Sequence, residues 1–190
     1  MNTPGHYILN LALLGKTISP KYHLVIAIGA ILPDIPIFGF YLIAKLILKI
    51  PEGKIWSEAY YESFWQNIIA LFHSLPLALI AVAIFYRLDY KPGMVLGLSL
   101  VCHSLLDFPV HHDDAHRHFF PFSNYRFFSP FSYWDTNHYG RIVALIEMAL
   151  VLGVNPLVFS WLHSPWTKGI VLAIDFFYLL GYFRFYLSNP

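Results

Sequence analysis

The sequence predicts an all-α protein built as a polytopic bundle of transmembrane helices, a single membrane-embedded domain over residues 1–190. Hydrophobic residues make up 57% of the 190 residues, and charged residues only 12%. Soluble domains carry roughly 25% charged residues to cover their surface. Because this chain has about half that share, we expect an integral membrane protein in contact with membrane lipid. The 12 Lys and Arg nearly balance the 11 Asp and Glu without a polybasic run, so no nucleic-acid partner is expected.

Five apolar regions approach the roughly 20 residues that a helix needs to cross a bilayer. They are Leu24–Ile50, Ile68–Tyr86, Gly93–Leu106, Ile142–Leu162 and Gly169–Leu187. The first of these long helices is predicted to be broken, because Pro33 and Pro36 cannot both lie inside one regular helix. Two arrangements of these helices stay open. Either Leu24–Leu32 is a half-span that ends at mid-depth, or Ser57–Leu88 is one long helix with His73 near its centre. An earlier apolar stretch, Tyr7–Leu14, is too short to span and lacks the marks of a secretory signal.

One connection, residues 107–140, is long and shows no helical or strand period. It contains five histidines and eleven aromatic residues. Such a density of aromatic side chains argues against disorder, because these side chains gain free energy by burial. We therefore expect an ordered cap loop, rich in aromatics and histidine, that folds over one end of the bundle.

Several ionisable residues lie inside or beside these apolar regions, where charge is costly and indicates function. Histidine and carboxylate without thiolate are ligands typical of zinc, manganese or iron sites. The single Cys102 excludes a Cys-rich zinc site and an intrachain disulfide. The ionisable residues point to a divalent metal site, with zinc as the first choice.

The clearest pair is His103 and Asp107, which lie four residues apart and so share one face of a helix. A helix-capping aspartate beside a hydrogen-bonded histidine would give the same pattern. His73 precedes Pro76, which opens the helix there, although a lone histidine in a bundle core is an equal alternative. Asp34 lies between two prolines in an apolar break, where its carboxylate has to be neutralised or bound to a cation.

The cap loop and the fourth apolar region add further candidates. His111 or His112 follows Asp107 within reach of a shared ion, while a solvated polar loop is the alternative for these residues. Glu147 is a candidate general base. It could equally be a ligand, a partner of Arg141 or a neutral acid.

Four short motifs carry a family resemblance by their order along the first 130 or so residues. They are Thr3–His6, Ile31–Asp34, Phe72–Leu75 and His103–Asp107. In this order they resemble the LexA-regulated membrane-bound metal-dependent hydrolase family, which looks like a distant membrane-embedded relative of the zinc-dependent phospholipases C. The resemblance implies a helical bundle, hydrolysis as its activity, and five metal ligands: His6, Asp34, His73, His103 and Asp107.

Three functions are consistent with these features of the sequence. The first is a metal-dependent hydrolase acting on a phosphoester or another ester, with lipids among the candidate substrates. The second is a non-catalytic membrane subunit or assembly factor whose metal is structural or vestigial. It is favoured by Pro36, which stands where the family has an acid. A metal or proton transporter ranks last, because the polar groups concentrate instead of lining a path.

Overall fold

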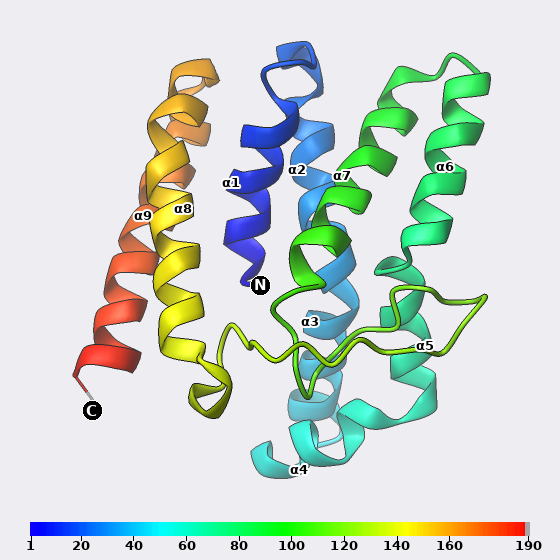
Figure 1. Cartoon of the computed structure of the whole chain (residues 1–190), viewed down its shortest axis with the longest axis vertical. Coiled ribbons are helices and arrows are strands. Elements are labelled where there is room, and N and C mark those ends of the chain that lie inside the picture. Colours follow the sequence, from blue (N-terminus) through cyan, green and yellow to red (C-terminus); the bar gives the residue numbers. More distant parts are fainter. Residues whose placement is uncertain (189–190) are drawn as a thin grey trace.

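The computed structural model describes residues 1–188, and every regular element in that range is helical. Figure 1 shows the helices packed side by side with their axes roughly along the longest dimension, crossed near the lower end by the long connection before α8. The helices are α1 (Thr3–Leu14), α2 (His23–Ile31), α3 (Ile35–Leu42), α4 (Glu52–Ser57), α5 (Ser63–Phe72), α6 (Leu75–Arg87), α7 (Lys91–Asp107), α8 (Gly140–Trp161) and α9 (Pro165–Tyr182). The all-α prediction is confirmed for this part of the chain.

Three helical runs within the described residues are long and apolar enough to cross a membrane: Pro20–Ile47, Gly140–Trp161 and Pro165–Leu187. Helices α5 and α6 pass the same test only as a pair, bent by 40° at the break between them. The sequence predicts five long helices, and the structure does not confirm that number. Helix α7 has 17 residues, or about 26 Å, short of the roughly 30 Å hydrocarbon core.

The predicted break in the first long helix is a single tight turn. A 3-10 turn over Leu32–Asp34 joins α2 to α3, and the run Pro20–Ile47 continues as one candidate span. Both prolines lie in the first turn of a helical segment, where a missing backbone N–H costs nothing. The turn buries Asp34 inside the bundle, with 8% of the residue exposed.

The N-terminal helix α1 occupies the centre of the bundle, between α8 and α2 (Figure 1). Its apolar residues were not predicted to form a helix of the core, because twelve residues are too few to span a bilayer. The main core cluster joins α1 to α2, α7, α8 and α9 through Ile8, Leu11, Ile26, Val95, Val151, Val158, Val171 and Ile174. Helix α1 thereby carries Thr3 and His6 into the interior.

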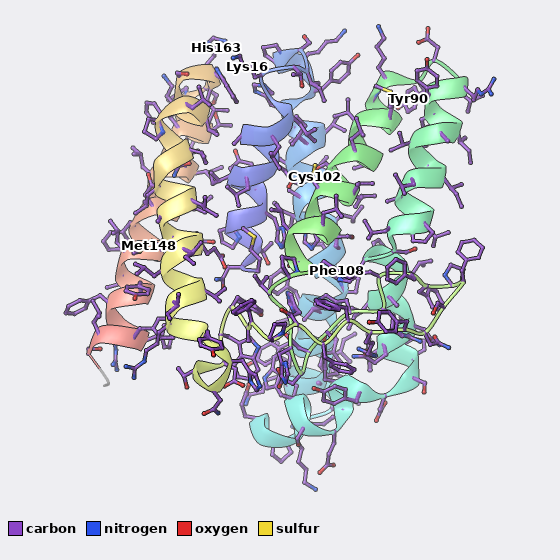
Figure 2. The ribbon with its side chains drawn as sticks, in the orientation of Figure 1. Lys16, Tyr90, Cys102, Phe108, Met148 and His163 are labelled. Atoms are coloured by element: carbon purple, nitrogen blue, oxygen red, sulfur yellow. The ribbon has the colours of Figure 1, made fainter. Side chains whose placement is uncertain are left out.

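The segment 107–140, here called the cap, is tied to the bundle by backbone hydrogen bonds. Leu75 N donates to the His118 carbonyl oxygen at the start of α6, and Ser129 N donates to the His111 carbonyl oxygen within the cap. The rings of Phe108 and Phe127 stack with centroids 4.7 Å apart. Figure 2 marks Phe108 where α7 passes into the cap. These contacts hold the cap against the start of α6 and connect it internally.

Candidate metal centre

Four buried side chains from three breaks or ends of helices converge in the bundle interior. Asp34 comes from the turn between α2 and α3, and His73 from the break between α5 and α6. His103 and Asp107 lie one turn apart at the carboxyl end of α7. One ligand atom of each residue lies within 4.8 Å of the others. The sequence predicts these four residues as metal ligands, and the structure brings them together.

Backbone carbonyls fix the orientation of both imidazole rings. Nδ1 of His103 donates to the Ala30 carbonyl oxygen at 2.7 Å, and Nδ1 of His73 donates to the Ile69 carbonyl oxygen at 2.9 Å. A carbonyl only accepts, so Nδ1 carries a proton in both rings, which leaves Nε2 as the nitrogen available to a metal. Neither Nε2 atom has a hydrogen-bond partner among the described residues, although both rings are fully buried. This is the arrangement that metal-binding histidines adopt.

The four His–Asp distances among the ligand atoms are close to those of a first coordination shell. His103 Nε2 lies 3.0 Å from Asp107 Oδ2 and 3.6 Å from Asp34 Oδ1, and His73 Nε2 lies 3.7 Å and 3.6 Å from the same two oxygens. Zinc bonds of about 2.0–2.1 Å at tetrahedral angles separate ligand atoms by roughly 3.4 Å. A divalent metal fits the donor types, burial and distances of this group, although Asp107 Oδ1 also pairs with the Met1 amino group at 2.7 Å.

The second oxygen of each carboxylate is held by helix α1. Thr3 Oγ1 donates to Asp34 Oδ2 at 2.6 Å, and His6 Nε2 donates to Asp107 Oδ1 at 2.9 Å. The other oxygens, Asp34 Oδ1 and Asp107 Oδ2, are the ones that face the two histidines. His6, a predicted ligand, therefore lies outside the four-residue group. Its ring stacks on His103 at 3.6 Å, so it orients two members of the group.

A second set of candidate ligands shares Asp107. Asp107, His111 and His116 also bring ligand atoms within 4.8 Å of one another. His111 Nε2, however, lies 2.7 Å from the Met1 amino nitrogen, and its Nδ1 lies 2.9 Å from Asp114 Oδ2. The four-residue group offers one ligand more than this set, so it is the better-formed cation site.

His116 was not predicted as a site residue, although the run His111–His118 contains it. Its ring stacks on His73 with centroids 4.0 Å apart. Burial lowers the pKa of His116 well below its ordinary value and lowers the pKa of His118 to about 4. Both rings are therefore neutral at pH 7 and add no positive charge beside the metal group.

His112 and Glu147 are the predicted site residues that the structure places elsewhere. His112 Nδ1 donates to the Ser129 carbonyl oxygen at 2.6 Å, and its ring stacks on His138. Consecutive residues of the cap turn point to different sides, so only His111 faces Asp107. Glu147 belongs to α8, which α1 separates from α7 (Figure 1).

The carboxylate of Glu147 has its own set of hydrogen bonds. Its Oε1 accepts from the Asn2 backbone nitrogen and side-chain amide, both at 3.0 Å, and from the Tyr178 hydroxyl at 2.6 Å. Glu147 lies in neither group of candidate ligands. These contacts connect α8 and α9 to the chain just before α1, so the structure gives Glu147 an anchoring position and does not bring it to the site as a general base.

A cavity of about 1040 Å³ borders the metal centre. Asp34, His111 and His116 line it on the side of the centre, and residues of α3, α4 and the cap form its other walls. No family model matches the chain, and neither does any curated protein or solved structure. The fold and the site therefore define its class on their own: a helical bundle with candidate membrane spans, a buried His/Asp group suited to a metal, and an adjoining cavity.

Proposed function

We propose that this chain is a membrane-bound, metal-dependent hydrolase of a phosphoester or another ester. The observation that carries the proposal is the pair of buried Nε2 atoms on His73 and His103, which face two carboxylate oxygens and have no hydrogen-bond partner in the described part of the chain. The spans Pro20–Ile47, Gly140–Trp161 and Pro165–Leu187 support the membrane location. The resemblance of the ordered motifs supports the hydrolytic class.

In this proposal the residues of the chain bind the metal and orient its carboxylate ligands. His73, His103, Asp34 and Asp107 would hold the metal, and Asp34 presents it to the cavity. A bound divalent ion of zinc, manganese or iron type supplies a Lewis acid and a water of lowered pKa. Thr3 and His6 restrict the two carboxylates to one orientation, and such outer contacts typically contribute 10–100-fold to affinity or activity.

A structural metal is the second candidate function. Four protein ligands fill a tetrahedral zinc shell, as in structural zinc sites, whereas catalytic zinc keeps one position open. An octahedral ion such as manganese would keep two positions open. The two functions therefore differ in whether an exogenous ligand reaches the ion from the cavity.

The metal is tested first. Protein purified in detergent should contain about one equivalent of divalent metal, measured by inductively coupled plasma mass spectrometry. His103→Ala and Asp34→Asn should lose it, while His163→Ala and Asp89→Asn should retain it, because His163 and Asp89 are exposed. Figure 2 shows His163 at the end of the bundle opposite the cap. Wild-type metal content in both site variants of folded protein would refute the site.

Hydrolysis is tested next on the same four variants. A chromogenic phosphodiester should be cleaved by the wild type and the two controls, and a chelator should abolish the cleavage until metal is restored. The two site variants should fall to the uncatalysed rate. Stoichiometric metal without cleavage of any phosphoester or carboxylester, and without access of azide or phosphate to the ion, would identify the metal as structural.

A further inference from the structure

Two partly exposed arginines of the cap, Arg117 and Arg126, lie where the cap meets α5. Arg117 donates to Asn67 Oδ1 at 2.7 Å, and Arg126 donates to Gln66 Oε1 at 2.6 Å. Gln66 and Asn67 are consecutive residues of α5. Burial and, after it, the positive charge of Arg126 lower the pKa of Arg117 from its ordinary value. The two guanidinium groups are therefore held close together.

Neither arginine forms an ion pair with a carboxylate in the part of the chain that the structure describes. Their other hydrogen bonds go to neutral oxygens as well, those of the Asn124 side chain and the Ala115 carbonyl. Asp114, an acid of the cap, pairs with His111 at 2.9 Å. Arg117 Nε has no hydrogen-bond partner among the described residues. Because like charges close together repel each other, this pair of cations is suited to an anion.

The two side chains are fixed by neutral groups before any ligand binds. The side-chain amide nitrogen of Gln66 donates to the Tyr60 carbonyl oxygen at 2.7 Å, which orients the amide that holds Arg126. The guanidinium of Arg117 lies 5.1 Å from the centre of the Phe120 ring. Guanidinium groups bind phosphate oxygens through pairs of N–H groups. Since these two are already ordered, binding a phosphate costs less conformational entropy.

The arginine pair lies at the ends of candidate membrane spans. The span Gly140–Trp161 begins directly after the cap, and α5, which holds the pair near its own start, begins the bent pair of helices α5 and α6. Figure 1 shows the cap crossing the bundle at this end. Between Arg117 and Arg126 the cap exposes aromatic rings, with Phe122 72% and Tyr125 58% exposed. Aromatic and basic residues at the ends of spans are typical of the membrane–water interface, where lipid phosphates lie.

We propose that Arg117 and Arg126 bind the phosphate of an anionic membrane lipid, whose chains lie against the exposed aromatic rings of the cap. This lipid is distinct from the substrate, because neither arginine lines the cavity beside the metal centre. The inference is therefore independent of the proposed hydrolase function. An anionic lipid is favoured over a zwitterionic one, whose ammonium group would bring a third positive charge to the pair. The bound lipid would fasten the cap to the membrane surface.

The experiment compares two lipids with the same chains, dioleoylphosphatidylglycerol and dioleoylphosphatidylcholine, by microscale thermophoresis of the full chain in detergent. The wild type should bind the phosphatidylglycerol about 10-fold more tightly. Arg117→Gln and Arg126→Gln should each reduce that preference to about threefold or less. Arg87→Gln removes the same charge at the exposed end of α6 away from the cap and should retain the preference. Arg117→Gln breaks two exposed hydrogen bonds, so it keeps the test valid if Arg126→Gln does not fold.

Equal binding of the two lipids by the wild type, or the wild-type preference in Arg117→Gln, would overturn the proposal. Inorganic phosphate, titrated in the same way, should bind at least about 10-fold more weakly than phosphatidylglycerol, because it has no chains to contact the aromatic rings. Equal affinity would make free phosphate the ligand and contradict the lipid.

A variant of the metal centre separates this site from the substrate site. Asp34→Asn should retain the preference for phosphatidylglycerol. Loss of the preference in Asp34→Asn together with its retention in Arg117→Gln would place the anionic lipid in the cavity beside the metal, and the cap site would be wrong. Absence of metal from the wild type would refute the proposed function, and the lipid preference should then be unchanged.

Discussion

At the scale of single residues, the hydrogen bonds of each imidazole distinguish a metal ligand from an ordinary core histidine. A core histidine satisfies both of its ring nitrogens with protein groups. His73 and His103 satisfy only Nδ1, and each leaves a buried Nε2 aimed at carboxylate oxygens. The sequence alone leaves both interpretations open, because residue spacing places a side chain on a helix face without showing its partners.

Removing the Thr3 hydroxyl should weaken the site without removing a ligand. Thr3→Val keeps the shape of the side chain but deletes the hydrogen bond to Asp34 Oδ2. We expect the metal dissociation constant to rise by about 10-fold or more, measured by competition with a chromophoric chelator. Thr17→Val is the matched control, since that hydroxyl donates only to the Leu14 carbonyl oxygen at the exposed end of α1. Equal affinities in the two variants would show that Thr3 does not position Asp34.

At the scale of elements, the ligands are presented where helices break or end. The turn at Leu32–Asp34, the break at His73 and the end of α7 each free a side chain to face the interior. Proline predicts the first two positions from the sequence. Proline does not predict the close approach of α2 to α7, which depends on Gly29: a Cβ there would lie 2.6 Å from Ser99 Cβ.

Adding a methyl group at Gly29 should therefore disturb both stability and metal binding. Gly29→Ala forces α2 away from α7, which carries His103 and its hydrogen bond to Ala30. We expect a loss of about 1–3 kcal/mol in the free energy of unfolding and weaker metal binding. Gly39→Ala, with no atom within 4 Å of the added Cβ, should be neutral or stabilising by up to about 1 kcal/mol. Thermal unfolding in detergent measures the stability of both variants. Equal unfolding midpoints for the two would contradict the close approach of α2 to α7.

At the scale of the whole molecule, composition predicts the all-helical class, and the order of apolar regions predicts most helices. The central position of α1 could not be predicted, because Tyr7–Leu14 is too short for a span and its role depends on packing against α2 and α8. The packing of α1 also explains why Glu147 lies away from the metal centre, because α1 lies between α8 and that centre (Figure 1). Long-range packing decides such positions, and a single sequence does not encode them in its periodicity.

The cap is expected to be as well ordered as the helices that it covers. The amide hydrogens of Ser129, Ser132 and Tyr133 donate to carbonyl oxygens of His111, His138 and Val110, respectively. Their hydrogen exchange should be slow, comparable to that of helix α7, because exchange requires these bonds to open. Hydrogen–deuterium exchange with mass spectrometry measures this. Complete exchange of residues 127–135 within seconds, in protein whose helices remain protected, would contradict an ordered cap.

The central claim is that two histidines and two aspartates of this bundle hold one metal ion. X-ray absorption spectroscopy of the metal-loaded protein tests it most directly, because outer-shell scattering counts imidazole ligands. We expect two imidazoles, light-atom ligands at about 2.0–2.1 Å for zinc, and no sulfur. His103→Ala should retain at most one imidazole in any residual metal, while His163→Ala should keep two. A sulfur ligand, no imidazole, or an unchanged spectrum in His103→Ala would contradict the account.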